Sequence, residues 1–234
     1  MKFIVEPKVF EALPDLCIGV VSVSGADNRR AYPAVEALLD EAAALAESRF
    51  AGKKVKEEPD ILPYRESFRQ LGINPNKYPC SVEALFTRIA KGKGMPRINP
   101  LVDLNNAVSL RYTLPMGTHD LSASPLNLEL RFAREGDVFL PFGEEQAETP
   151  EPGELIYAAG NDVRTRRWTW RQSEHGKITP ETNRVFFPID GFRGFNEDRV
   201  REAMAAVERG AVDLLGAQAR GFLIDREHPA AELD

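Results

Sequence analysis

Residues Asn127–Phe132 read NLELRF and alternate strictly between polar and apolar side chains. This alternation is typical of a β-strand with one buried face. It also marks a change along the chain. Before Thr113 most long segments have helical patterns, whereas after it short strand-like runs are separated by Gly and Pro. Helices followed by a block of strands favour an α+β fold over a doubly wound sheet.

The helices are predicted from apolar stripes and from capping residues. Ala31–Phe50 has a long amphipathic stripe, with Asn28 as a candidate cap. In Ile61–Leu71, Pro63 fits the first turn, where its missing N–H costs little. The other predicted helices are one that begins at Ser81 as N-cap and runs to Lys91, Val102–Tyr112, and Glu197–Leu215 with Asn196 as cap.

Further strands are predicted where β-branched and apolar residues cluster between turn residues. These are Lys2–Val5, Leu16–Val23, Val138–Phe142, Glu154–Ala158, Arg184–Ile189 and Gly221–Asp225. The polar tail after Asp225 is expected to fray. We expect one domain over residues 1–234, built of two closely packed lobes that divide near residues 113–126.

Composition excludes several classes of protein. The chain has 234 residues, a formal charge of -6 and 43% apolar residues, which are ordinary values for a globular protein. It has no apolar run long enough to span a bilayer and no signal-peptide core, so we expect no membrane partner. Two cysteines, Cys17 and Cys80, cannot form a disulfide framework. The expected compartment is the cytoplasm.

Basic residues concentrate in two segments of this acidic chain. Lys53–Arg97 holds ten basic and five acidic residues, and Arg164–Lys177 holds five basic and one acidic. Their net charges of +5 and +4 leave -15 for the rest. Such patches suit a focused polyanion site, although they are equally consistent with solvated faces whose fields cancel.

The common metal and nucleotide motifs are missing. No two of the three histidines have the close spacing of metal ligands, and no phosphate-binding glycine loop or nucleophile elbow is present. We therefore expect no metal and no cofactor. Cys80 precedes a predicted helix, but packing is a simpler role for it than nucleophilic attack.

The densest group of reactive side chains lies in RRWTWRQSEHGKIT, residues 166–179. Trp168 and Trp170 would share one face of a strand, with Arg167 and Arg171 on the other. Such a surface could stack an unpaired base and hold phosphates, although paired tryptophans more often belong to the core of a sheet. Glu174 and the adjacent His175 could supply groups for proton transfer.

Three stretches together resemble a known family. INPLVDLNNAVSL (98–110), followed by PMGTHDL (115–121), is similar to a segment of the phenylalanyl-tRNA synthetase beta subunit. SEHGKITPETNRVFF (173–187) resembles that family's Gly-Gly-Glu loop and the Thr-x-x-Thr strand after it. Together with YRESFRQLGINPNKYPCSVEALFTRI (64–89), the chain resembles free-standing B3/4 domain proteins, which consist of little beyond the synthetase's editing module.

The resemblance implies an α+β fold with a central cleft, in which the synthetases hydrolyse tyrosine wrongly esterified to tRNA. It places the family's cleft Glu on Glu174 and its cleft His on Gly117, which is a departure. Either His119, two residues later, replaces that imidazole or the cleft has another amino-acid specificity. The family's Gly-Gly is Gln172-Ser173 here.

The resulting hypothesis is a trans-acting editing hydrolase for aminoacyl-tRNA. Its partners would be the acceptor end of the tRNA and the attached amino acid. Glu174 and His119 would be catalytic. The expected substrate contacts are Asn105, Asn106, Gly117, Trp168 and Trp170, and the expected tRNA contacts are Lys91, Lys93, Arg167 and Arg171.

Two alternatives remain open. The first is a non-catalytic module of the same fold that binds tRNA, other RNA or a free amino acid, which the change at Gly117 favours. The second is an interaction domain that uses the helices Ala31–Phe50 and Glu197–Leu215, although their apolar stripes are more simply core. The sequence also leaves open whether His119 or His175 is the working imidazole.

Overall fold

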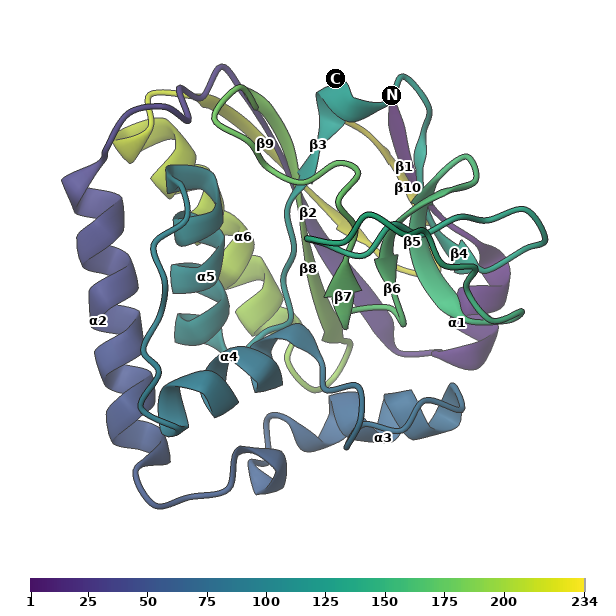
Figure 1. The fold of residues 1–234 in the computed structure, drawn as a ribbon, viewed down its shortest axis with the longest axis horizontal. Coiled ribbons are helices and arrows are strands. Elements are labelled where there is room, and N and C mark those ends of the chain that lie inside the picture. The colour runs from purple at the N-terminus through teal and green to yellow at the C-terminus, as the bar shows by residue number, and fades with distance from the viewer. Residues whose placement is uncertain (234) are drawn as a thin grey trace.

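Strand β2 (Leu16–Ser24) is buried on both faces, as its continuous apolar sequence LCIGVVSV requires. In the computed structural model, which describes residues 1–233, Leu16 and Val20 belong to one hydrophobic core and Cys17 and Val21 to another. β2 therefore borders two cores (Figure 1). One lies between the two sheets and continues to α2 (Pro33–Phe50) and α4 (Ser81–Ala90), and the other lies between the smaller sheet and the helices that cover it.

The smaller sheet is antiparallel and has four strands in the order β3-β8-β2-β9. Its other strands are β3 (His119–Asp120), β8 (Arg184–Phe192) and β9 (Gln218–Ile224). The larger sheet has the order β10-β1-β4-β5-β6-β7, and only its β1–β4 pair is parallel. Its strands are β1 (Lys2–Val5), β4 (Leu128–Phe132), β5 (Leu155–Ala159), β6 (Asp162–Arg166), β7 (Arg171–Gln172) and β10 (Ala230–Glu232).

Helices cover the smaller sheet on the side away from the larger one. α6 (Glu197–Arg209) packs directly on β2, β8 and β9, and its last turn continues as the π-helical segment η3 (Gly210–Leu214). α5 (Pro100–Tyr112) packs on α6, and α2 (Pro33–Phe50) packs on α5 (Figure 1). Gly19 allows α6 to approach β2 closely, because a Cβ at this position would lie 2.6 Å from the Met204 side chain.

The remaining helices close the ends of the molecule. They are α1 (Pro7–Ala12), α3 (Leu62–Gln70), α4 (Ser81–Ala90), and the short 3-10 turns η1 (Val55–Glu57) and η2 (Leu121–Ala123). Tyr64 and Phe68 of α3 pack against Trp168, which follows β6. None of the helices within residues 1–233 is long and apolar enough to cross a membrane.

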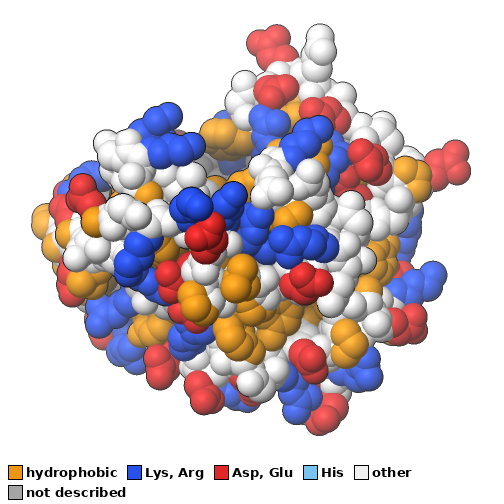
Figure 2. Space-filling view, turned by 90° about the horizontal axis from the view of Figure 1, so that it is seen from below, with side chains coloured by type: hydrophobic (Ala, Val, Ile, Leu, Met, Phe, Trp, Pro, Cys, Tyr) orange, Lys and Arg blue, Asp and Glu red, His pale blue; other side chains and the backbone are white. Residues whose placement is uncertain are grey.

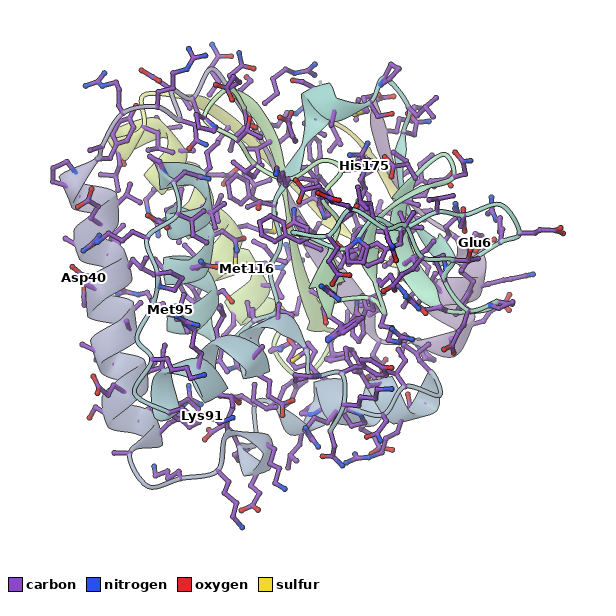
Figure 3. All side chains as sticks on the ribbon, viewed as in Figure 1. Glu6, Asp40, Lys91, Met95, Met116 and His175 are labelled. Atoms are coloured by element: carbon purple, nitrogen blue, oxygen red, sulfur yellow. The ribbon has the colours of Figure 1, made fainter. Side chains whose placement is uncertain are left out.

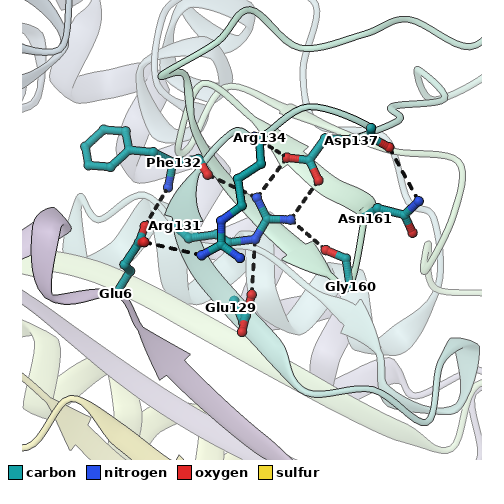
Figure 4. A network of polar contacts seen from close by, with 9 residues as sticks. Glu6, Glu129, Arg131, Phe132, Arg134, Asp137, Gly160 and Asn161 are labelled. Atoms are coloured by element: carbon teal, nitrogen blue, oxygen red, sulfur yellow. Dashed lines mark hydrogen bonds and ion pairs between the residues drawn. The ribbon is translucent and has the colours of Figure 1, made fainter.

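A buried arginine stabilises the hairpin of β4 and β5. Both terminal nitrogens of Arg131 donate to the Asp137 carboxylate, at 2.8 and 2.7 Å, and Nη2 also donates to the Gly160 carbonyl (Figure 4). Asp137 accepts in turn from the Arg134 backbone N–H. The buried pair is therefore bidentate and well satisfied, the geometry in which a buried ion pair is tolerated.

The α+β class is confirmed, and most long elements lie where the sequence placed them. The cap assignments differ. Asn28 does not cap α2; its side-chain oxygen accepts from the Leu101 N–H at the start of α5. α4 begins with Cys80 as N-cap, not Ser81. Asn196 is the N-cap of α6, but its side chain accepts from Phe192 N–H and donates to Tyr64.

Two strand-level expectations are wrong. Val138–Phe142 forms only isolated bridges, because Pro141 has no N–H to continue a ladder. The polar tail does not fray: Ala230–Glu232 pairs with β1 as the edge strand β10.

Candidate functional site

The alternation of β8 determines which of its side chains face the space between the two sheets. Val185 and Phe187 point into the core beneath α5 and α6, whereas Phe186 packs against Phe3 of the larger sheet. Pro188 and Asp190 follow Phe186 with the period of two of a strand, so they lie on the same face. The strand thereby places a carboxylate between the sheets.

A cavity of about 130 Å³ lies at this position, between β8 and β3 on one side and β5, β6 and the turn before β7 on the other. Its volume is close to that of the roughly 150 Å³ hole that holds benzene in an engineered core, and below the usual range of cofactor sites. It therefore suits an amino-acid-sized group. Its lining includes the side chains of Met116, His119, Tyr157, Trp168, Thr169 and Asp190.

The turn before β7 is not the strand that the sequence suggested. Arg167 and Trp168 have φ angles of 47° and 60°, so the chain is left-handed here and the i, i+2 rule does not apply. The two tryptophans are therefore not equivalent. Trp168 is fully buried at the closed end of the cavity, whereas Trp170 is half-buried at its opening.

Asp190 is buried and hydrogen-bonded on one side only. Its Oδ1 accepts from Trp168 Nε1 at 2.7 Å and from the Tyr157 hydroxyl at 2.9 Å. No residue within 1–233 donates to Oδ2, and none of the described ion pairs involves this carboxylate. Burial raises the pKa of Asp190 to about 7, even though both donors favour its charged form.

His119 is also buried and lies against Tyr157, with ring centroids 5.8 Å apart. Burial, assisted by the charge of Arg164, lowers the pKa of His119 to about 3, so its imidazole is neutral at physiological pH. Its Nδ1 has no partner among the described residues, and neither has the hydroxyl of Thr169. Buried polar groups are normally hydrogen-bonded, so two unsatisfied atoms on residues that line one cavity are unusual.

Glu174, the expected partner of His119, does not line this cavity. It lies on a surface loop, where its carboxylate accepts from the Gly143 N–H at 3.0 Å and pairs with Lys177, whose ammonium lowers the pKa of Glu174. His175 is exposed and bonds to Asp162 at 3.0 Å. Of the two candidate imidazoles, His119 lines the cavity and His175 does not.

Only some of the expected substrate contacts line the cavity. Gly117 lines the cavity, and a Cβ added there would lie 3.8 Å from His119 Nε2, an ordinary contact distance. Asn105 and Asn106 are buried in α5 instead, where they share a weak hydrogen bond of 3.4 Å. Neither asparagine lines the cavity, so the structure does not gather residues 105, 119 and 174 around one void.

The mouth of the cavity carries two cations, Arg171 and Lys177, each paired with a glutamate. Thr118, Trp170, Arg171 and Gln172 line both the cavity and a broader groove of about 740 Å³, which also contains Lys177. Arg171 is half-buried and pairs with Glu144 at 2.6 Å.

Arg167, by contrast, is not free to bind a phosphate. It is buried over the Tyr78 ring, with its guanidinium carbon 4.0 Å from the ring centroid. It also lies within 3.4 and 3.6 Å of carboxylate oxygens of Glu151 and Glu154. Arg167 therefore acts as a structural link, held by two acids and an aromatic ring.

Lys91 and Lys93 lie in a separate basic groove of about 830 Å³. In Figure 3 Lys91 is in the lower left part of the molecule, whereas Met116 of the cavity is near the centre. Figure 2 looks onto the end that carries α3 and η1, over which many Lys and Arg side chains are spread. The other cations lining this groove are Lys53, Lys54, Lys56, Arg65 and Arg88.

A family model described as the B3/4 domain matches residues 63–211, more than half of the chain. The chain belongs to the B3/4 domain family. This confirms the resemblance seen in the sequence.

No curated protein matches this B3/4 domain. Among solved structures, it is similar to the crystal structure of an N-terminal fragment of the phenylalanyl-tRNA synthetase beta-subunit from Pyrococcus horikoshii, with 12% identity and a TM-score of 0.49. The match covers 93% of this chain and 49% of that fragment, so the chain spans about half the fragment's length.

Four residues of the site were missed in the sequence: Met116, Tyr157, Thr169 and Asp190. Asp190 is the single acidic residue in the apolar strand RVFFPIDGF, and an acid in such a run could have been taken as a signal of a buried functional group. Tyr157 lies in the apolar strand LIYAA and had no comparable signal. The described residues hold no cluster of three or more His, Cys, Asp or Glu side chains suited to a metal ion.

Proposed function

We propose that this B3/4 domain hydrolyses the ester bond of aminoacyl-tRNA and takes the amino acid into the cavity of Asp190 and His119. The observation that carries the proposal is the cavity's chemistry. It is amino-acid-sized and open on one side, and two of its lining residues, His119 and Thr169, carry polar atoms that have no described protein partner. Membership of the B3/4 family and the resemblance to a synthetase editing module supply the substrate class.

The chemistry demands little of the protein. An aminoacyl ester is already activated, so the site must position a water molecule and stabilise the oxyanion that forms as water attacks the carbonyl. The imidazole of neutral His119 lines the cavity with Nε2 on the side of Gly117, so it can orient water there. Thr169 also lines the cavity and can donate its hydroxyl to the substrate once its side chain rotates. A low pKa makes His119 a weak general base, so we assign it to positioning water.

The tRNA end would lie across the mouth. Arg171 and Lys177 provide positive charge there, and the half-buried ring of Trp170 offers a face for stacking. Phosphates further along the acceptor arm would reach the groove of Lys91 and Lys93. Binding through such contacts weakens steeply as salt rises.

A second candidate is a module that binds an amino acid or aminoacyl end without cleaving it. Two observations favour this alternative. The imidazole that lines the cavity is a weak base, and Glu174, to which the family resemblance assigned contact with the amino acid, lies outside the cavity.

Deacylation of a panel of aminoacyl-tRNAs separates the two candidates. We expect at least one aminoacyl-tRNA to be cleaved faster than the buffer control, with Thr169→Val and His119→Gln each slower by about 10- to 1,000-fold. Glu174→Ala is the matched control from outside the cavity and should retain activity. Binding of aminoacyl-tRNA without cleavage of any panel member would favour the binding module. A large loss in Glu174→Ala with none in His119→Gln would show that the cavity is not the reacting site.

A further inference from the structure

Asp190 is a buried acid without a cationic partner. Its exposed fraction is 1%, and the two side-chain donors that reach it, Trp168 and Tyr157, are neutral. Several other buried acids are paired with arginine, as Asp137 is with Arg131 and Glu83 with Arg65, whereas Asp103 accepts from the Ile98 N–H. A buried carboxylate without such a pair stays protonated or requires a cation from outside the protein.

The position of Asp190 in the cavity indicates which part of a ligand it would contact. The cavity opens through Thr118, Trp170, Arg171 and Gln172, which it shares with the outer groove. Asp190 belongs instead to its fully buried lining. An amino acid whose ester stays at the mouth therefore directs the end of its side chain, not its α-amino group, toward Asp190.

The walls suit a cation on an apolar stem. Met116 and Pro188 provide apolar contacts, and the rings of Tyr157, Trp168 and His119 surround the carboxylate end. Aromatic faces attract cations, most strongly when these are removed from water. The orphaned Oδ2 of Asp190 supplies the acceptor that an ammonium group needs.

We propose that the cavity selects an amino acid whose side chain ends in a primary ammonium group, bound by Asp190 at the closed end. The orientation of this ligand rests on the proposed function, since it assumes that the carboxyl end of the amino acid points to the mouth.

The experiment compares two probes that differ in one group. L-lysinamide and L-norleucinamide share the α-ammonium, the amide and the four-carbon stem, and only lysinamide has the terminal ammonium. We expect calorimetric titration of the wild-type chain to show lysinamide bound about 10- to 100-fold more tightly, the range typical of a charged hydrogen bond.

The variant Asp190→Asn tests whether Asp190 is the residue that binds the terminal ammonium group. Asparagine keeps a side-chain oxygen that can accept from Trp168 and Tyr157, so the fold should persist, and thermal unfolding checks this. The lysinamide preference should fall to within about threefold, whereas Asp15→Asn, a change at an exposed aspartate, should retain it. A wild type that binds norleucinamide or L-tyrosinamide at least as tightly as lysinamide overturns the inference. Equal weakening of both amides by Asp190→Asn would place the α-ammonium at Asp190 and overturn it as well.

These titrations contain no tRNA and no ester, so their outcome is separate from that of the deacylation panel. Cleavage confined to aminoacyl-tRNAs with uncharged side chains would support the hydrolase and reject the ammonium ligand. Selective binding of lysinamide without cleavage of any ester would support the ammonium ligand and reject the hydrolase.

Discussion

Asp190 of the smaller sheet accepts a 2.7 Å hydrogen bond from the indole nitrogen of Trp168, which follows the β6 strand of the larger sheet. The bond crosses the space between the sheets at the closed end of the cavity. It therefore joins two parts of the fold whose contact creates the site, through residues that are 22 positions apart in the sequence.

The first prediction concerns the strength of that bond. Trp168→Phe removes the donor and Asp190→Leu removes the acceptor. In a double-mutant cycle measured by urea unfolding, we expect a coupling energy of about 1–2 kcal/mol. Tyr157→Phe removes the other donor to Oδ1 and serves as the comparison within the same site. Additive effects of Trp168→Phe and Asp190→Leu would mean that the bond does not stabilise the contact between the sheets.

Asp190 and His119 should have opposite effects on stability as pH changes. The pKa of Asp190 rises from 3.8 to about 7 on folding, so between these values the folded state binds more protons and the free energy of unfolding falls with rising pH. The pKa of His119 falls from 6.5 to about 3, so there the unfolded state binds more protons and the free energy of unfolding rises with pH. From about pH 4 to 6.5 the two contributions cancel.

The second prediction isolates the contribution of His119 to the pH dependence of stability. In Asp190→Asn only the His119 contribution remains, so the free energy of unfolding should rise by about 3 kcal/mol relative to wild type between pH 4 and 6.5. Urea unfolding at several pH values measures this, and His119→Gln should show the opposite slope. A profile of Asp190→Asn that runs parallel to wild type would contradict the assignment.

Local sequence patterns predicted the parts of the fold that depend on local chemistry. The 3.6-residue stripe of Glu197–Leu215 corresponds to α6 and its π-helical continuation, and the alternation of Asn127–Phe132 corresponds to β4. Alternation failed where the backbone left the extended region. Positive φ angles at Arg167 and Trp168 turn the chain, and no periodicity argument detects such a turn without glycine.

The site itself was only partly predictable. The family resemblance directed attention to residues 117–119, and His119 does line the cavity. Glu174 was assigned to the cleft through a loop whose Gly-Gly is Gln172-Ser173 here, and this loop directs Glu174 toward Gly143 and Lys177. Asp190 was missed because its significance comes from Trp168 and Tyr157, which only tertiary packing brings beside it.

The third prediction concerns the pH dependence of ligand binding. An ammonium group binds to the ionised form of Asp190, whose pKa burial raises to about 7. The lysinamide preference over norleucinamide should therefore weaken below pH 7, by up to about tenfold per unit, and level off above pH 8. The α-amino group of the two amides titrates alike and cancels in this ratio.

The other groups near Asp190 whose pKa values are shifted do not titrate near pH 7. Tyr157, its hydrogen-bond donor, and Tyr64, which donates to its backbone carbonyl, have pKa values raised by burial. Burial raises the pKa of Cys17 on β2 to about 12, and His119 across the cavity stays neutral. A preference that stays constant from pH 5 to 8 would therefore mean that Asp190 does not bind the ammonium.

The fourth prediction tests the groove of Lys91 and Lys93 as a path for RNA phosphates. Both lysines are exposed and lie among further cations, so reversing their charges should weaken phosphate contacts and leave the cavity unchanged. We expect Lys91→Glu/Lys93→Glu to raise the Kd for tRNA by at least about tenfold. The slope of log K against log salt should become shallower by about 1.5, because each phosphate contact with a single strand or duplex contributes roughly 0.7–0.9.

Lys8→Glu, an exposed lysine on α1, is the control for a general change in charge and should alter Kd much less. Lysinamide binding should be unaffected by the Lys91 and Lys93 changes, because neither residue lines the cavity. If Lys8→Glu weakens tRNA binding as much as the double variant, with an equal change in salt slope, the attraction arises from the overall charge of the protein. The RNA would then have no defined path through this groove, and its orientation at the cavity would depend on Arg171 and Lys177 at the mouth.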